Sequence, residues 1–304
     1  MNHASPLYAG VELGGTKCIC VLGTGPNDIR EQLFIPTGDN PELALSQIET
    51  AFRSWHIKHG AVKALGIASF GPIDMKANSA TYGYITSTPK PGWTHTNVAR
   101  RLLKVYHDLG VKSLAMGFDT DVNGAALAEG RWGAAQSLDN FAYITVGTGV
   151  GVGLVVANRT VRGISHPELG HIRIVRMHGD TWPGSCPFHG DCVEGLVSGT
   201  AIQARSAAQG DGLLWESVAH GIAQLIHAMV VSTTPKRVII GGGVINAHPD
   251  LFPVIRHMLV KSLNGYIQAP ELSDAIDQYI VAPGLDTKSG PLGALAVAID
   301  AMHS

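Results

Sequence analysis

Two cysteines and a histidine lie close together in one short, glycine-containing segment of the chain. The segment reads Cys-Pro-Phe-His-Gly-Asp-Cys and places Cys186, His189 and Cys192 three residues apart. Two thiolates and an imidazole at this spacing can take three positions of a tetrahedral zinc site, which one more histidine would complete. Two histidines precede the segment, His171 and His178. Spacing alone does not choose between them.

A disulfide is the alternative for the cysteines of this segment. The chain has four cysteines in 304 residues and begins without the apolar stretch of a secretory signal. This composition argues against a disulfide-bonded secreted scaffold and makes the cytoplasm the expected location. Cys18 and Cys20 alternate within an apolar run, so we expect them to pack in the core. At Cys186 and Cys192 we therefore expect a metal.

Three glycine-rich segments each follow an apolar run that is typical of a strand. In chain order they are Glu12-Leu13-Gly14-Gly15-Thr16-Lys17, Gly147-Thr148-Gly149-Val150-Gly151 and Gly241-Gly242-Gly243. Glycines let backbone N–H groups approach an anion such as a nucleotide phosphate, and threonine and lysine add donors. Glu12 could hold Mg²⁺ through water. One shared nucleotide site is favoured over three unrelated turns, because strand ends meet at one edge of an α/β sheet.

An acidic segment, Asp119-Thr120-Asp121, ends one predicted strand and begins an alanine-rich helix. An aspartate in this position is a common helix N-cap. It can also act as the general base that takes a proton from a hydroxyl group attacking the γ-phosphorus of ATP. The residue types alone leave Asp119 and Asp121 as equal candidates for the base.

The remaining pattern predicts strands that alternate with helices, which indicates an α/β fold. Strands are expected over residues 7–13, 17–22, 64–69, 114–119, 141–146, 153–157 and 237–240. Helices are expected over residues 41–58, 96–109, 123–132, 214–233 and 291–302, with a long loop over 82–93. A strand–glycine–strand arrangement occurs near residues 7–22 and again near 141–157, so the chain is expected to consist of two related halves.

Length and charge exclude several classes of protein. A chain of 304 residues can bury two medium-sized cores, which favours two domains. The net charge is near −2 and the basic residues are dispersed, so nucleic acid is not an expected partner. Apolar runs are shorter than a bilayer-spanning helix requires, so no membrane is expected either.

The segments described above occur in the order seen in the ROK family of sugar kinases and repressors, and the chain resembles that family over nearly its whole length. The most specific part of the resemblance is Ser-His-Pro-Glu-Leu-Gly-His at residues 165–171, together with the zinc segment. Within the family, the loops at residues 69–74 and 88–93 resemble those of the bacterial fructokinases.

The resemblance implies an α/β fold of the actin-like ATPase (ribonuclease H-like) type, with two domains around an ATP and sugar cleft. We expect a smaller domain over residues 1–120, to which the C-terminal helix of residues 289–304 returns. A larger domain over residues 121–288 would carry the zinc-binding loop. ATP, Mg²⁺ and a structural Zn²⁺ are the implied cofactors, and a homodimer is the implied assembly.

The resemblance also implies roles for individual residues. Asp121 becomes the base and Asp119 its supporting neighbour, while the first two glycine segments hold phosphates and Gly241–Gly243 lie against the adenosine. The residues expected to contact the sugar are Gly71, Pro72, Thr120, Asp121, Glu168, His171 and Glu194. The expected zinc ligands are His171, Cys186, His189 and Cys192, which favours His171 over His178.

Differences from the wider family narrow the range of expected substrates. Glu12 stands where an aspartate is usual, as in the fructokinase branch, and Thr120 where asparagine is common. The zinc segment is Cys-x-x-His-x-x-Cys, whereas glucokinase-type members have Cys-x-Cys. These differences favour D-fructose, phosphorylated to fructose 6-phosphate, over the alternatives mannose, glucose or an N-acetylhexosamine. Residues 287–290, Thr-Lys-Ser-Gly, lack the usual Ala-Gly pair, which leaves the adenine contact there open.

Two rivals to an enzyme are a sugar-sensing repressor and a non-catalytic sugar-binding protein. A repressor needs a helix-turn-helix module ahead of the first phosphate loop, and only six residues precede the first expected strand. A non-catalytic protein would have no need of Asp121 and both phosphate loops. We therefore expect a kinase.

Overall fold

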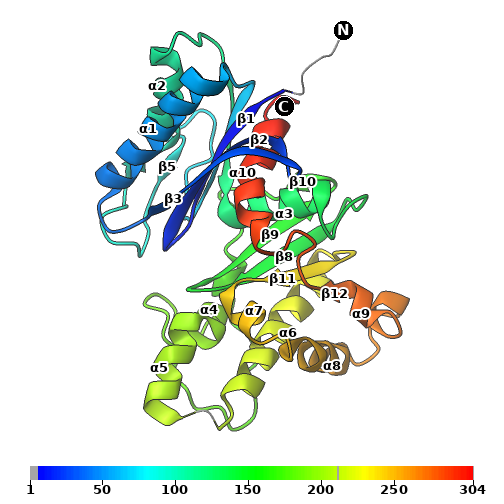
Figure 1. Cartoon of the computed structure of the whole chain (residues 1–304). Helices are drawn as coiled ribbons and strands as arrows, with labels where there is room; N and C mark the ends of the chain where they lie inside the picture. The colour runs from blue at the N-terminus through cyan, green and yellow to red at the C-terminus, as the bar shows by residue number, and fades with distance from the viewer. Residues whose placement is uncertain (1–5, 211, 304) are drawn as a thin grey trace. The chain divides into compact units, whose positions relative to one another are not determined.

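The computed structural model describes residues 6–210 and 212–303, and the chain divides into two compact units. Unit 1 comprises the chain up to Gly133, the segment Val161–His166 and the chain from Lys288 onward. Unit 2 comprises Ala134–Thr160 and Pro167–Thr287. Figure 1 shows the elements of both units along the chain. The domain limits expected from the sequence, residues 1–120 and 121–288, concern independently folding parts of the chain. They stay a prediction.

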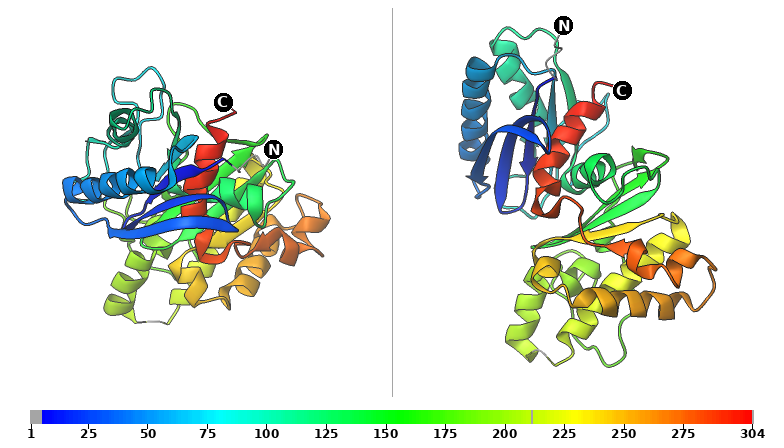
Figure 2. Two further views of the ribbon diagram at one scale, coloured as in Figure 1. Left: turned by 45° about the horizontal axis from the view of Figure 1, so that its top comes forward. Right: turned by 45° about the vertical axis from the view of Figure 1, so that its right-hand side comes forward.

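Unit 1 is built on a five-stranded sheet with strand order β3-β2-β1-β4-β7. Strand β1 pairs antiparallel with β2 and parallel with β4, which in turn pairs parallel with β7. In Figure 2 the sheet lies between α1 and α2 on one face and α10 on the other. The strands are β1 (Tyr8–Leu13), β2 (Lys17–Gly25), β3 (Asp28–Pro36), β4 (Ala64–Ser69) and β7 (Ala115–Thr120), with short β5 (Tyr84–Ile85) and β6 (Thr96–Asn97). The helices are α1 (Pro41–His59), α2 (Ala99–Asp108), α3 (Asp121–Trp132) and α10 (Ser289–Asp300).

Unit 2 repeats this sheet, in the order β10-β9-β8-β11-β12. Its first strand, β8, again pairs antiparallel with the next strand and parallel with β11, so the two predicted related halves are confirmed. The strands are β8 (Phe141–Val146), β9 (Val150–Val156), β10 (Arg159–Thr160), β11 (Val238–Gly241) and β12 (Ile280–Val281). The helices are α4 (Val193–Val197), α5 (Gly199–Gln209), α6 (Leu214–Ser232), α7 (Gly243–Ala247), α8 (Leu251–Leu263) and α9 (Ile276–Tyr279), with 3₁₀ turns η1 (Leu169–His171), η2 (Pro270–Leu272) and η3 (Asp286–Lys288).

The sequence patterns located most of these elements and missed three long ones. The missed elements are β3, α5 and α8. Strand β3 is an edge strand whose side chains are mostly exposed, so it lacks the apolar run that marks a buried strand. The start of β9 is also corrected, because the strand begins at Val150 inside the predicted glycine loop. Within the described ranges, no helix combines the length and the apolarity that a bilayer-spanning segment needs.

Three glycines let α10 lie directly on the backbone of the unit 1 sheet. Gly10, Gly66 and Gly117 are paired neighbours on strands β1, β4 and β7, and so form a row across the sheet. A Cβ atom added to Gly66 would lie 1.8 Å from the carbonyl oxygen of Ala294 in α10. One added to Gly117 would lie 2.3 Å from the carbonyl oxygen of Val297. Side chains larger than hydrogen are therefore excluded from this row.

A Gly66→Ala variant should be much less stable than the wild type. The added methyl group would meet helix backbone, which cannot yield as a side chain can, so α10 must shift off the sheet. We expect a loss of about 3 kcal/mol in the free energy of unfolding, measured by urea denaturation. Gly212→Ala is the matched control, because a Cβ there meets no atom within 4 Å. A Gly66→Ala protein as stable as this control would contradict the packing argument.

Candidate active site

The first glycine segment is the tight turn between β1 and β2. The Gly14 N–H donates to the carbonyl oxygen of Lys17 at 3.0 Å, which closes the turn. Thr37 fixes the turn from behind: its hydroxyl donates to the Gly14 carbonyl at 2.7 Å, and its N–H donates to the Thr16 carbonyl at 3.0 Å. Thr37 is buried, and it follows β3, the strand that the sequence patterns missed. Gly15, Thr16 and Lys17 are exposed, as an anion-binding turn requires.

Glu12 places a carboxylate at the end of β1, beside this turn. Its Oε1 lies so close to Gly290 that a Cβ there would approach it to 2.3 Å. Its Oε2 is buried and lacks a hydrogen-bond partner among the described residues. Burial, and then the negative charge of Asp121, raise the pKa of Glu12 to about 7, against the opposing charge of Lys17. A buried carboxylate oxygen without a partner, next to an anion-binding turn, fits a hydrated divalent cation.

Asp121 is the first residue of α3, and Thr120 rather than Asp121 caps that helix. The Thr120 hydroxyl accepts a hydrogen bond from the N–H of Asn123 at 3.2 Å, so the interpretation of Asp121 as the N-cap is wrong. The Asp121 carboxylate accepts a hydrogen bond from the adjacent Val122 N–H, at 2.9 Å. Burial raises the pKa of Asp121 to about 6, although hydrogen bonds from the backbone N–H groups of Val122 and of Asp121 itself lower it. The group can therefore take up a proton near neutral pH.

Asp119 has a different environment, which separates the two candidate bases. Its Oδ1 accepts hydrogen bonds from the Thr120 N–H at 2.8 Å and from the Asn123 side-chain amide at 2.7 Å. Its Oδ2 lies 2.7 Å from Nη2 of Arg162 in an ion pair. Both oxygens of Asp119 are thus engaged in hydrogen bonds or an ion pair, and Asp121 stays the predicted base. The sequence patterns missed Arg162, because nothing in the spacing links it to a residue 43 positions away.

The turn predicted to contact the sugar leaves the sheet beside Asp121. Strand β4 ends at Ser69, which is the paired neighbour of Thr120 on β7. Gly71 and Pro72 follow, joined by a cis peptide bond. The Pro72 carbonyl accepts hydrogen bonds from the backbone N–H of Thr86 at 2.8 Å and from its hydroxyl at 3.0 Å. Carboxyl ends of neighbouring parallel strands thus carry the predicted sugar turn and the predicted base.

In unit 2, the second and third glycine segments also follow neighbouring strands. Gly147-Thr148-Gly149 joins β8 to β9, and the N–H of Gly199, the first residue of α5, donates to the Gly147 carbonyl at 2.7 Å. The third segment ends β11 at Gly241, the paired neighbour of Thr145 on β8. Gly242 has a φ of +98°, and a Cβ there would lie 2.6 Å from the N atom of Val146, so both conformation and space require glycine. Helix α7 begins at Gly243.

The Glu194 side chain connects the second glycine segment to the predicted metal site. Its Oε2 accepts a hydrogen bond from the Val150 N–H at 3.0 Å, and a Cβ on Gly149 would come within 2.6 Å of the same oxygen. Its Oε1 lies 3.9 Å from Nε2 of His171. Glu168 precedes the 3₁₀ turn η1, and its carbonyl accepts from the His171 N–H at 2.9 Å. Two predicted sugar contacts of unit 2, His171 and Glu194, therefore have side chains that face each other, and the backbone of Glu168 is bonded to that of His171.

The four predicted metal ligands come together, with donor atoms that all lie within 4.8 Å of one another. They are His171, Cys186, His189 and Cys192. Nδ1 of His171 is 3.7 Å from Sγ of Cys186 and 3.6 Å from Sγ of Cys192, and Nδ1 of His189 is 3.7 Å from Sγ of Cys186. Ideal zinc–sulfur and zinc–nitrogen bonds at a tetrahedral angle place these atoms about 3.6 Å apart, so the donor set fits zinc.

The histidine that completes this group is His171, and its role as the fourth ligand stays a prediction. His178 is an exposed residue outside the cluster. All four cysteines, each within the described ranges, are free thiols, so the disulfide alternative is not realised. His171 directs Nδ1 at the sulfurs and leaves Nε2 facing Glu194. A metal-bound imidazole can offer its second nitrogen to a hydroxyl group.

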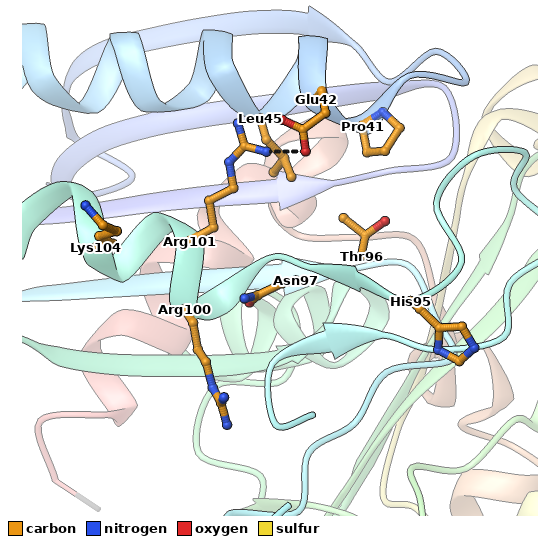
Figure 3. Close-up of a pocket in the computed structure, with 9 residues that line it drawn as sticks. All are labelled: Pro41, Glu42, Leu45, His95, Thr96, Asn97, Arg100, Arg101 and Lys104. Carbon is orange, nitrogen blue, oxygen red and sulfur yellow. Dashed lines mark hydrogen bonds and ion pairs between the residues drawn. The ribbon is translucent and has the colours of Figure 1, made fainter. Parts of the chain in front are cut away.

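A cavity of about 540 Å³ in unit 1 is lined by other residues (Figure 3). Its polar side chains are largely paired: Arg101 with Glu42 at 2.7 Å, and Lys104 with Asp108 at 2.8 Å. It is lined by Pro41, Glu42, Leu45, His95, Thr96, Asn97, Arg100, Arg101 and Lys104, a set that differs from the predicted site residues. We do not assign the predicted chemistry to it.

Comparisons with known proteins point to one family. A family model described as the ROK family matches residues 8–301. A fructokinase of Pediococcus pentosaceus is 37% identical over 98% of this chain and 99% of that protein. A fructokinase of Lactococcus lactis subsp. cremoris is 34% identical over 92% of each chain. The solved structure of a ROK family glucokinase from Streptomyces griseus, in complex with glucose and AMPPNP, is 25% identical with a TM-score of 0.73 and covers 97% of this chain and 99% of that one.

Replacing one histidine should remove the metal. His171→Ala deletes one of four donors, so we expect the purified variant to hold well under one zinc ion per chain, measured by elemental analysis. His178→Ala is the matched control, because this nearby histidine is exposed and outside the cluster. It should retain the wild-type content. Equal zinc in both variants would contradict the assignment of His171.

Proposed function

Because the chain belongs to the ROK family, we propose that it transfers the γ-phosphoryl group of ATP to D-fructose, giving fructose 6-phosphate. Family membership also confirms the actin-like ATPase fold expected from the sequence. The observation that carries the proposal is the carboxylate of Asp121, whose raised pKa suits a base, at the strand end beside the turn of Gly71 and Pro72.

The residues of unit 1 supply the base and part of the phosphate site in this proposal. Asp121 accepts the proton of the 6-hydroxyl group of fructose as that oxygen attacks the γ-phosphorus. The exposed N–H groups and Thr16 hydroxyl of the first turn, with Lys17, bind phosphate oxygens. Glu12 would hold Mg²⁺ through water, and the ion would neutralise charge on the phosphates. Asp119 keeps the start of α3 in place through its bonds to Thr120 and Asn123.

Residues of unit 2 contact both ATP and the sugar in this proposal. Gly147, Thr148 and Gly149 contact phosphate, and Gly241–Gly243 lie against the adenosine. Glu168, His171, Glu194 and Thr120 are the residues that would hydrogen-bond to sugar hydroxyl groups. The ligands His171, Cys186, His189 and Cys192 would hold a structural Zn²⁺, which would fix the sugar-binding loop. The AMPPNP and glucose of the Streptomyces griseus structure support an ATP and hexose site in this family.

Fructose is favoured over other hexoses by relatives and by residue types together. The two fructokinases compared above share 37% and 34% of their residues with this chain, whereas the glucokinase shares 25%. Relaxed use of mannose, glucose or an N-acetylhexosamine is the alternative, because hexoses present similar hydroxyl groups to a polar site. A homodimer in the cytoplasm is also part of this proposal, and light scattering of the purified protein tests the assembly.

A panel of hexoses with Mg-ATP tests the proposed activity. We expect D-fructose to give the highest kcat/KM and Asp121→Asn to lower kcat on fructose by at least about 10²-fold, because the amide cannot accept the proton. Fructose binding to that variant, measured by calorimetry, should be nearly unchanged. Equal rates on glucose and fructose would remove the fructokinase assignment. Full turnover by Asp121→Asn would remove the role of this residue.

Activity should fall as the pH is lowered through the range of two raised pKa values. Asp121, with a pKa of about 6, and Glu12, with a pKa of about 7, are both needed as carboxylates, so protonation of either reduces kcat/KM. We expect a rise from pH 5 to pH 8, and excess Mg²⁺ should move its midpoint toward 6, because the cation competes with the proton on Glu12. A rate that stays constant over this range would contradict both assignments.

A further inference from the structure

The turn after β4 carries one buried backbone N–H group that its own hairpin does not use. The chain around Ile73 runs antiparallel to β5. On either side of Ile73, the Pro72 carbonyl accepts from the Thr86 N–H at 2.8 Å, and the Asp74 N–H donates to the Tyr84 carbonyl at 2.9 Å. A residue between two such bonds points its own N–H away from the partner strand. The N–H of Ile73, a buried residue, therefore needs an acceptor from elsewhere.

His166 supplies that acceptor from a distant part of the sequence. Its Nε2 lies 3.1 Å from the backbone N of Ile73, 93 residues earlier in the chain, and the imidazole is buried. Because Nε2 accepts, the neutral ring carries its proton on Nδ1. A phenyl ring in this place would leave the Ile73 N–H buried and unpaired, and the turn would have to move to reach another acceptor.

The ring of His166 is held in position by the short segment that ends with it. Val161–His166 belongs to unit 1 although the chain on both sides belongs to unit 2. The segment is fixed by the ion pair between Arg162 and Asp119 and by a turn in which the Gly163 N–H donates to the Ser165 carbonyl at 2.9 Å. Pro167 follows and restricts the backbone of His166 to extended conformations. The acceptor is therefore presented by a fixed backbone.

We propose that His166 is a positioning residue for hexose binding, which acts by fixing the turn Gly71-Pro72-Ile73 through the Ile73 N–H. The inference rests on the proposed function, in which Gly71 and Pro72 contact the sugar. Pro72 has no N–H to anchor the turn, and Gly71 places little restriction on it. The hydrogen bond from the Ile73 N–H to His166 is therefore one of few that fix the position of this turn. The phosphate turn is held instead by Thr37, so His166 should affect the hexose and not ATP.

Substitution of His166 tests this role by steady-state kinetics on fructose. His166→Phe keeps a ring but removes the acceptor, and we expect the KM for fructose to rise about tenfold. The KM for ATP should stay within about twofold, because the nucleotide segments do not use this bond. His166→Gln should recover most of the loss, since its Oε1 reaches about as far as Nε2. Ile164→Ser, at a side chain 92% exposed in the same segment, is the matched control and should behave as wild type.

Three results would overturn the inference: an unchanged fructose KM in His166→Phe, an equal rise in the KM for ATP, or no recovery in His166→Gln. If His166→Phe fails to fold, His166→Gln and His166→Asn make the same test, because the shorter asparagine cannot place its oxygen at the Nε2 position. Equal fructose KM values in that pair would then overturn it. A wild type that phosphorylates no hexose removes the proposed function and this inference together, whereas an active wild type with an unaffected variant removes only the inference.

Discussion

Backbone contact between α10 and the sheet of unit 1 is the constraint that sets the positions of the carboxylates at one end of that sheet. The row of Gly10, Gly66 and Gly117 brings the helix onto the strands, and α3 meets α10 through a second glycine contact, Gly124 with Gly293. Side chains along a strand return to the same face every second residue. Two residues beyond the glycine row, this rule places Glu12 and Asp119 on the face that α10 and α3 cover.

This arrangement gives three carboxylates at neighbouring strand ends three different environments. Glu12 lies against Gly290 at the start of α10, with one oxygen unpartnered among the described residues. Asp119 is neutralised by Arg162 and bonded to α3. Asp121 accepts hydrogen bonds from the backbone, among them from the Val122 N–H, and has a raised pKa. Three carboxylates of similar intrinsic pKa can thus serve different purposes. Glu12 can bind a cation, Asp119 holds the start of α3, and Asp121 can accept a proton.

The sequence was informative wherever function depends on neighbouring residues. Glycines after apolar runs marked the turns, and the spacing of Cys186, His189 and Cys192 marked the metal cluster, because both signals lie within a few residues. Strand β3 was missed because an exposed edge strand lacks a regular pattern of apolar residues. The roles of Thr37 and His166 were missed because their hydrogen-bond partners are 23 and 93 residues away in the sequence. Spacing could choose neither His171 over His178 nor Asp121 over Asp119; the family resemblance made both choices, and the contacts of His171 and Asp121 are compatible with them.

In unit 2 a single carboxylate couples the metal cluster to the second glycine segment. Glu194 directs Oε1 toward Nε2 of His171 and uses Oε2 to hold the Val150 N–H at the end of that segment. Gly149 must lack a side chain for this carboxylate to fit. The position of the second glycine segment therefore depends on that of the loop that carries Cys186 and Cys192. A cation at the cluster would orient the imidazole, the imidazole would orient Glu194, and Glu194 would set the backbone N–H where β9 begins.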